Sequence, residues 1–401
     1  MVVSVLFVIG ATAGVLLIKN KLIKTSDDDT TATTSEINDA TTNEAGLAES
    51  NADSGTPDSG TPGSDAADSG TDLGSENSHV SVDAAGNLTI NTNTVETAKS
   101  EPVSLLVSSM GDCTLGTDKN FSYSSSVNAY YSKNGAAYFF QNVKPILEAD
   151  DLSIVNMEGT LTTSNTRMDK TFAFKGDAEF ANILVEGSVE AANLANNHSK
   201  DYGEVSYTDT IAALDAAGIV NFGYDRIAVM EIKGIKVGLC GIYELGSGMG
   251  CATQLKTNIA LLKQQGAQLI IVNFHWGIER EYSPNSTQTS LAHIAVDEGA
   301  NLVIGHHPHV LQSIEKYNGV YICYSMGNFC FGGNSNPSDK DTMIFQQTFH
   351  FDENQELVPS DEINIIPCRV SAHTGYNDYC PTPVDGADAE RVLGKLKRIG
   401  W

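Results

Sequence analysis

Between residues 102 and 330, short apolar runs alternate with segments of helical spacing. This alternation predicts an α/β domain. Beyond residue 333 two further strand-like runs, Met343–Phe351 and Glu362–Pro367, suggest a second sheet. The earlier runs expected to form strands are Val103–Ser109, Leu152–Asn156, Val189–Ala195, Ile235–Tyr243, Leu269–Phe274 and Leu302–Ile304. The segments expected to form helices are Asn134–Leu147, Val205–Ala217 and Ser286–Glu298.

Most of the expected strands end in polar side chains of one chemical kind. Three histidines fall within Gly305–His309, directly after a buried run. Sites in open α/β sheets form at the carboxyl ends of the strands, where the loops converge on a rigid support. Carboxylate, amide and imidazole groups are ligands of Zn, Mn and Fe, so we expect a shared polar site that binds metal. The residues at the strand ends are Asp112, Glu158, Asn197, His198, His275, His307 and His309.

Each of these residues taken singly has a plainer explanation. Asp112 and Glu158 could be turn carboxylates, and His275 could be a core histidine. Asn196 and Asn197 could cap the next helix, since Asn is a favoured N-cap. Asp201 is equally well explained by helix-start chemistry. Independent turn residues have no reason to recur at successive strand ends, so the shared site is the stronger interpretation; His306 is assigned to the layer behind the ligands.

The negative charge is concentrated before the predicted domain. The chain has 401 residues and a net charge of −26, and residues 25–101 hold 16 Asp and Glu but a single Lys. This Ser/Thr/Gly/Asp segment repeats Asp-Ser-Gly-Thr-Pro at 53–57 and 58–62. Too little apolar surface is available to offset ordering entropy, so we expect an extended spacer. A stalk and a tail of no specific role both fit, and the lack of clustered Lys and Arg argues against nucleic acid.

An apolar run without charges, residues 2–18, opens the chain and is followed by Lys19, Lys21 and Lys24. It fits a short membrane span or the hydrophobic region of a signal peptide. The lysines favour a cytoplasmic domain by the positive-inside bias, whereas the spacer favours display outside the cell. We expect a single-pass protein of the cell membrane with an extracytoplasmic domain. The expected divisions are 1–24 (anchor or signal segment), 25–101 (spacer), 102–350 (domain) and 351–401 (an extension packed on the domain).

The seven cysteines have no CxxC spacing, so a structural zinc site is not expected. An odd number leaves at least one thiol unpaired within a monomer. Cys368 and Cys380 could form a disulfide, and nothing in the sequence decides this.

The spaced motifs resemble the CapA family of poly-γ-glutamate capsule synthesis proteins, a branch of the calcineurin-like metallophosphoesterases. The resemblance covers residues 102–350 and follows one order: Gly-Asp, Asn-x-Glu, Asn-Asn-His, His-Trp-Gly and Gly-His-His-Pro-His. The matching sequence segments are Asn193–Gly203, His275–Glu279, Asn301–Gln312 and Tyr324–Phe329.

The resemblance implies two mixed β-sheets flanked by helices, with up to two divalent ions (Mn, Fe or Zn) at the strand ends. Asp112 and His309 would bind the first ion, and Glu158 would bridge both ions. The second ion would take Asn197, His275 and His307, with His198 as the general acid or transition-state partner beside Asn197. Glu279, Ser325 and Asn328 recur in the matched motifs and are expected to line the cleft.

Two departures from the phosphoesterase pattern bear on activity. The phosphoesterase pattern has Asp-x-His at its first motif, whereas here Asp112 is followed by Cys113 and Thr114. Glu158 takes the position of the bridging Asp. The first ion therefore lacks one ligand. One hypothesis is a metal-dependent hydrolase or transferase acting on poly-γ-glutamate or its phosphorylated precursor, with membrane-bound capsule synthase subunits as partners. The other is a non-catalytic capsule assembly or export subunit that holds anionic polymer. A nucleotide phosphatase or nuclease follows from the fold likeness alone and is weaker.

Overall fold

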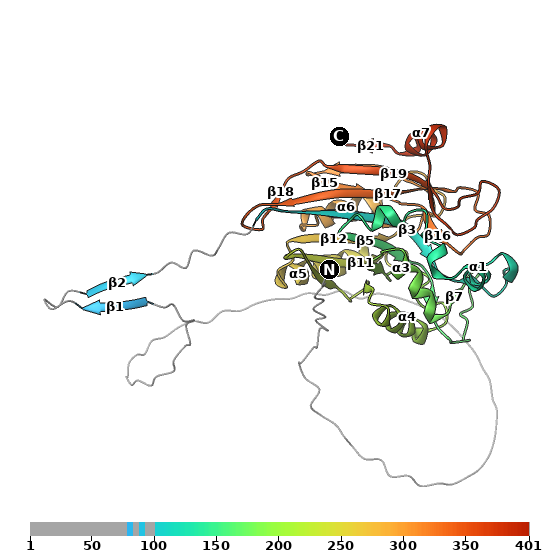
Figure 1. Ribbon diagram of the computed structural model, residues 1–401, viewed down its shortest axis with the longest axis horizontal. Helices are drawn as coiled ribbons and strands as arrows, with labels where there is room; N and C mark the ends of the chain where they lie inside the picture. The colour runs from blue at the N-terminus through green and yellow to red at the C-terminus, as the bar shows by residue number, and fades with distance from the viewer. Residues whose placement is uncertain (1–77, 83–87, 93–100, 401) are drawn as a thin grey trace, which may run out of the picture. The chain divides into compact units, whose positions relative to one another are not determined.

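Two β-sheets stack face to face between two layers of helices in the computed structural model (Figure 1). The structure describes residues 78–82, 88–92 and 101–400. Residues 101–400 belong to one compact unit, and the described residues 78–82 and 88–92 belong to another. The expected membrane segment lies outside the described residues, and no helix among the described residues is long and apolar enough to span a bilayer.

The smaller unit contains one antiparallel strand pair, β1 (Ser78–Val82) and β2 (Leu88–Thr92). This pair departs from the extended spacer expected over residues 25–101. Both strands carry β-branched residues, which favour extended pairing, and an argument from average composition misses such short runs.

The first sheet of the larger unit has nine strands, and its parallel half carries the first site residues. β3, β5, β8 and β9 run parallel, while β17 pairs antiparallel with both β3 and β19. In chain order its strands are β3 (Val103–Thr114), β5 (Leu152–Met157), β8 (Ala191–Asn193), β9 (Val220–Phe222), β16 (Asn328–Phe331), β17 (Asp341–Phe351), β18 (Leu357–Val358), β19 (Ile363–Arg369) and β20 (Thr382–Pro383).

The second sheet has seven strands in the order β10-β11-β12-β13-β15-β14-β21. β11, β12, β13 and β15 are parallel, and one helix links β11 to β12 while another links β12 to β13 along the chain. Its strands are β10 (Ala228–Ile232), β11 (Ile235–Tyr243), β12 (Leu269–His275), β13 (Leu302–His306), β14 (Ile314–Tyr317), β15 (Val320–Cys323) and β21 (Arg398–Ile399). A separate three-stranded sheet holds β4 (Thr117–Asp118), β6 (Thr160–Leu161) and β7 (Phe174–Gly176).

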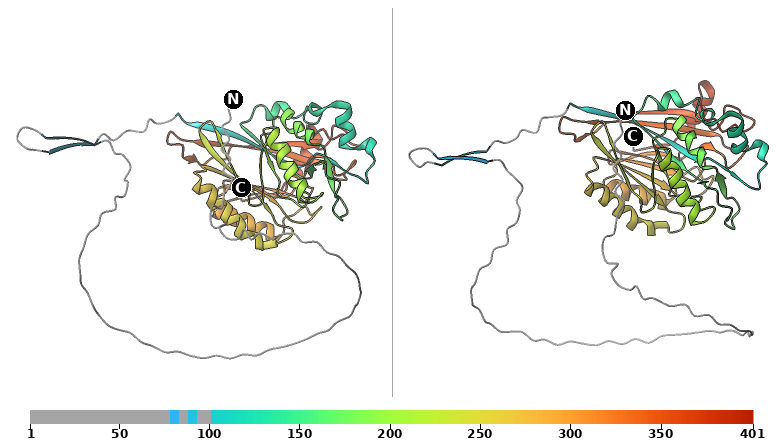
Figure 2. Two further views of the ribbon diagram at one scale, coloured as in Figure 1. Left: turned by 90° about the horizontal axis from the view of Figure 1, so that it is seen from below. Right: turned by 60° about the horizontal axis from the view of Figure 1, so that its bottom comes forward.

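Three apolar clusters hold these layers together. One lies between the two sheets, one between the nine-stranded sheet and its helices, and one between the seven-stranded sheet and α5 and α6, which lie together on one side in Figure 2. The helices are α1 (Val127–Asn134), α2 (Lys144–Leu147), α3 (Asn182–Glu186), α4 (Glu204–Ala216), α5 (Ala252–Gln264), α6 (Ser286–Asp297) and α7 (Gly386–Lys395). Short 3-10 helices are η1 (Tyr123–Ser125), η2 (Ala136–Tyr138), η3 (Ala178–Ala181) and η4 (Gly248–Cys251).

Local patterns predicted most elements well. The strand expected at Ile235–Tyr243 is β11 residue for residue, and the helix expected from Ser286 is α6. A capping box starts α6: Asn285 accepts from the Gln288 N–H while Gln288 accepts from the Asn285 N–H.

Three predictions about the elements are wrong. The helix expected over residues 134–147 is broken, because Gly135 ends α1 at φ 76° and Pro145 can only open the next short helix. Asp112 lies within β3 rather than in a loop after it. β17 and β19 do not build a separate sheet but complete the sheet of β3, a long-range pairing that local periodicity does not encode.

All seven cysteines are free and buried. Cys368 and Cys380 are therefore not paired in this structure.

Two carboxyl groups, Asp150 and Glu190, lie just before β5 and β8, at the opposite end of these strands from the predicted site. The Ser153 N–H donates to Glu190 Oε2 at 2.8 Å, and the Ser153 hydroxyl donates to Asp150 Oδ2 at 2.7 Å. Burial, followed by the neighbouring Asp150 charge, raises the pKa of Glu190 to about 8. Between about pH 4.5 and 8, the folded protein therefore keeps a proton on Glu190 that the unfolded chain has lost.

Replacing Glu190 by glutamine is expected to stabilise the protein at alkaline pH. In the parent, stability falls as pH rises through the pKa of Glu190, and the neutral amide removes that loss while keeping an acceptor for Ser153. We expect a gain of about 1–2 kcal/mol at pH 9, reduced by partial solvent access, and little change at pH 5. Urea unfolding at both pH values measures it, with exposed Glu356→Gln as the control. An equal effect at both pH values would contradict the assignment.

Candidate metal centre

The carboxyl ends of parallel strands from both sheets meet in one polar centre. The nine-stranded sheet contributes Asp112 from β3 and Glu158 directly after β5. The seven-stranded sheet contributes His275, the last residue of β12, and the histidines at and after the end of β13. The predicted site residues, widely separated in sequence, are thus brought together; their roles as ligands stay predictions.

Glu158 occupies the middle of this centre. Its side chain is completely buried, and neither carboxylate oxygen has a hydrogen-bond partner among the described residues. Its Oε1 lies 3.6 Å from His275 Nε2, 3.9 Å from His309 Nε2 and 3.9 Å from His198 Nε2. A buried carboxylate left without a partner is costly and calls for a cation or proton.

Asp112 is the second buried carboxylate, and it is fully hydrogen-bonded. Asn156 Nδ2 donates to its Oδ1 at 2.9 Å, and His309 Nδ1 lies 3.1 Å from its Oδ2. His306 Nδ1 lies 3.4 Å from Oδ1. Burial alone would raise the pKa of Asp112, but the hydrogen bonds and charges of His306 and His309 hold it well below its usual range. Asp112 is therefore ionised.

The arrangement fits divalent cations. Ligand atoms of Asp112, Glu158 and His309 lie within 4.8 Å of one another, as do those of Glu158, His275 and His307. The two groups share Glu158, and ligands bonded at about 2 Å to one ion lie up to roughly 4 Å apart. Together with the orphaned Glu158 oxygens, these groups could hold a pair of ions bridged by one carboxylate.

Burial and neighbouring charges together set the pKa values of these side chains. It lowers the pKa of His275 well below the usual range and, together with the nearby His309 charge, lowers that of His307 to about 4. Burial also raises the pKa of Glu158, with the Asp112 charge adding to it. For His309 burial acts downward, but the charges of Glu158 and Asp112 prevail and raise its pKa to about 9. Neutral His275 and His307 keep a lone pair available for a cation.

Asn197 and His306 take different positions. Asn197 Oδ1 lies 2.7 Å from His275 Nε2, so its amide faces the same space as the second group. His306 Nε2 lies 3.2 Å from Asn273 Oδ1, and its ring belongs to none of the ligand groups. This agrees with the expectation that His306 stands behind the ligands.

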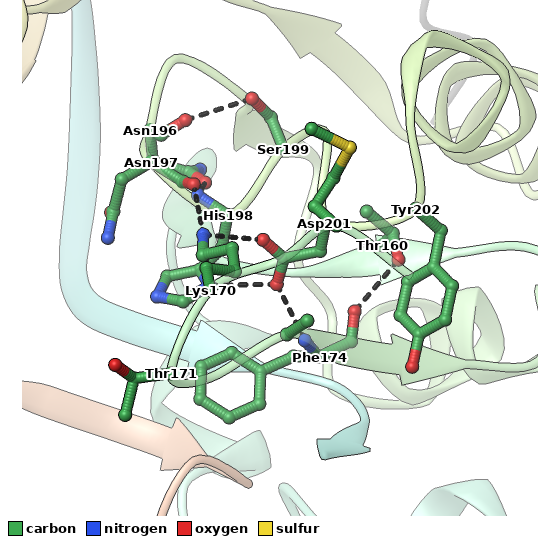
Figure 3. A network of polar contacts seen from close by, with 12 residues as sticks. Thr160, Lys170, Thr171, Phe174, Asn196, Asn197, His198, Ser199, Asp201 and Tyr202 are labelled. Carbon is green, nitrogen blue, oxygen red and sulfur yellow. Dashed lines mark hydrogen bonds and ion pairs between the residues drawn. The ribbon is translucent and has the colours of Figure 1, made fainter. Parts of the chain in front are cut away.

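His198 is held by a charged network at the rim (Figure 3). Its Nδ1 lies 2.8 Å from Asp201 Oδ2, and Lys170 Nζ donates to Asp201 Oδ1 at 2.7 Å. Its ring packs on Phe174, with centroids 4.5 Å apart. Burial lowers the pKa of His198 although Asp201 opposes this. The contact with Asp201 orients the ring so that Nε2 points to the centre.

The helix-start interpretation of residues 201–203 holds for Gly203, the N-cap of α4, whereas Asp201 lies before the helix. Helix α4 begins at Glu204 with Gly203 as its N-cap, and no side chain caps it. Asp201 instead binds His198 and Lys170 and accepts from the Phe174 N–H.

Amide side chains support the centre. Asn328 was expected to line the cleft, whereas the sequence analysis assigned no role to Asn156 and Asn193. Asn156 joins Asp112 to Asn193, whose Nδ2 donates to Asn156 Oδ1 at 2.9 Å. Asn328 Oδ1 lies 2.9 Å from His309 Nδ1. Asn156 and Asn273 each stand two positions before a site residue, and side chains at that spacing share a face of a strand. That spacing was a usable signal, whereas Lys170 lies in a loop with no such pattern.

The fold and the site together define an α/β protein with two stacked mixed sheets, flanked by helices, whose converging strand ends present two buried carboxylates and a histidine cluster. A match to the family described as bacterial capsule synthesis protein PGA_cap spans residues 106–333, more than half of the chain. The chain belongs to this family.

Two relatives carry names related to capsule synthesis. The PGA biosynthesis protein CapA of Bacillus subtilis is 33% identical over 221 residues, which are 50% of this chain and 58% of that protein. The capsule biosynthesis protein CapA of Bacillus anthracis is 29% identical over 299 residues, 68% of this chain and 70% of that protein. The match thus spans little more than half the length of the Bacillus subtilis relative. A solved phosphatase of Mycoplasma pneumoniae aligns with a TM-score of 0.42 at 16% identity, covering 66% of this chain and 93% of that one.

Proposed function

We propose that the chain is a cell-envelope protein of poly-γ-glutamate capsule biosynthesis or export, working through a metal-dependent site of the calcineurin-like phosphoesterase kind. The observation that carries the proposal is Glu158, a buried carboxylate without a hydrogen bond and shared by two ligand groups. The printed names of the Bacillus relatives supply the capsule context. The proposal includes membrane attachment, display of the domain outside the cytoplasm, and membrane-bound synthase subunits as partners.

The residues of the centre divide into holding and proton-transfer roles. Asp112, Glu158 and His309 would hold one ion, and Glu158, Asn197, His275 and His307 would hold the other. Bound there, two divalent ions would supply the positive charge that stabilises a phosphoryl group during displacement. His198, oriented by Asp201, presents Nε2 toward the same space and is placed to give a proton to a leaving oxygen.

A second candidate function follows from the first motif. Thr114 stands where the phosphoesterase pattern has a histidine, so the first ligand group contains only Asp112, Glu158 and His309. A centre weakened in this way would favour a non-catalytic subunit that holds the anionic polymer for assembly or export.

One experiment separates the two functions. The full chain, loaded with Mn²⁺, is assayed for hydrolysis of p-nitrophenyl phosphate and for co-sedimentation with poly-γ-glutamate, each with and without EDTA. Hydrolysis that EDTA abolishes and that falls at least about 100-fold in His198→Ala supports the metal-dependent enzyme. Polymer binding that survives EDTA, without hydrolysis, supports the assembly subunit. Absence of both activities contradicts both candidates.

A further inference from the structure

The incomplete first ligand group has a structural origin in β3. Side chains alternate along a strand, so Thr114 faces the same side as Asp112 while Cys113 faces away. The Cys113 side chain belongs to the apolar cluster between the nine-stranded sheet and its helices, so it faces away from the centre. The Thr114 hydroxyl is buried without a hydrogen-bond partner, and its short side chain replaces the imidazole.

A carboxylate approaches the same histidines from another element. Glu279 lies in the loop after β12, and its carboxylate forms a third group with His307 and His309, with ligand atoms within 4.8 Å of one another. Glu279 is exposed to solvent, and it makes no hydrogen bond or ion pair with another described residue. His309 belongs both to this group and to the incomplete group of Asp112 and Glu158.

The loop that carries Glu279 is fixed onto the histidine segment. The Arg280 N–H donates to the Pro308 carbonyl at 2.8 Å, and Gln312 Nε2 donates to the Glu281 carbonyl at 2.7 Å. Arg280 has φ 64°, and His307 and His309 have φ 95° and 56°. Non-glycine residues in this region cost free energy, and such residues cluster at functional sites. These two hydrogen bonds thus hold the loop with Glu279 beside His307 and His309.

We propose that Glu279 is a ligand of the first divalent ion and replaces the imidazole that Thr114 cannot provide. The inference rests on the metal-dependent site proposed above. Glu279 shares a ligand group with His309, and its exposed side chain would turn toward Asp112 and Glu158 to join the first set. The first ion would then have three carboxylates, Asp112, Glu158 and Glu279, and one imidazole, His309. An oxygen-rich set of this kind favours Mn²⁺ over Zn²⁺, while the second position, with two imidazoles, suits Zn²⁺.

Calorimetric titration of the metal-free full chain with Mn²⁺ tests the inference, using the parent, Glu279→Gln and Glu281→Gln. Glu281 is exposed in the same loop, so its variant is a control that removes an equal charge. Substituting a residue that only hydrogen-bonds to a metal ligand weakens metal affinity by about 10–100-fold. Loss of a direct ligand in Glu279→Gln should therefore weaken one of the two Mn²⁺ sites at least about tenfold. Glu281→Gln should stay within about twofold of the parent.

A third variant, Glu279→His, supplies an imidazole at the same place. It should recover the weakened site and change its preference from Mn²⁺ toward Zn²⁺ in competition titrations. The inference would be overturned if the parent, Glu279→Gln and Glu281→Gln each bound two equivalents of Mn²⁺ with the same affinities. That result would leave the proposed function standing. A parent that binds no Mn²⁺ or Zn²⁺ would overturn both.

Discussion

Replacing Glu158 by glutamine should reduce the metal content of the protein from about two equivalents to less than one. The carboxylate belongs to both buried ligand groups, so one substitution weakens both positions. An amide carries no charge to balance two divalent cations at this buried position. Elemental analysis of the purified full chain after dialysis measures the loss, and exposed Glu231→Gln on β10 is the control.

The same substitution should have the opposite effect on the metal-free protein. Glu158 is buried with both oxygens unpaired, and an uncharged side chain of equal size relieves that cost. Without metal, we expect the free energy of unfolding of Glu158→Gln to be about 1 kcal/mol higher than that of the parent. When Mn²⁺ is added, the parent should become the more stable of the two. A variant that keeps two equivalents would refute the bridging role. A variant that is less stable without metal would show that Glu158 has a structural partner.

Gly305→Ala should cause the largest loss of stability. Gly305 lies in β13, and an added Cβ would be 2.0 Å from the Tyr324 carbonyl oxygen and 2.5 Å from Trp276 Nε1. Those two atoms form a hydrogen bond of 2.8 Å, so neither side can yield without breaking it. We expect a loss of about 2–4 kcal/mol in urea unfolding, because the interior is close-packed and the neighbour is backbone.

The substitution should also weaken metal binding, since β13 carries His306 and His307 into the centre. Gly394→Ala is the matched control, because a Cβ there meets nothing within 4 Å and the residue lies in α7. Alanine is a better helix former, so this variant should gain up to about 1 kcal/mol. Equal stability of the two variants would contradict the close approach at Gly305.

The candidate site was more predictable from the sequence than the division of strands between the sheets. His275 and His307 follow apolar runs, and a strand end is a local feature that hydrophobic periodicity locates. Nothing local in Met343–Phe351 indicates that it pairs with β3, because that partner lies more than 230 residues earlier. Gly135 and Pro145 are local signals for the break in the helix expected over residues 134–147.

The residues that support the site show the same limit. Asn156 shares a strand face with Glu158, so its place could be read from spacing alone. Lys170 reaches Asp201 from a loop whose path depends on the rest of the fold, and Glu279 reaches the histidines only because Arg280 bonds to Pro308. Contacts of this kind depend on tertiary packing and have no periodic signature.

The two sheets contribute the site from opposite sides, with Asp112 and Glu158 on one and His275 and His307 on the other. An ion bound between them, as proposed, would cross-link the two sheets at the polar edge of the sandwich. Such a cross-link would form only after the sheets have docked, so metal binding and docking of the sheets would be coupled. An ion present at 100 times its dissociation constant would add about 2.7 kcal/mol to that docking.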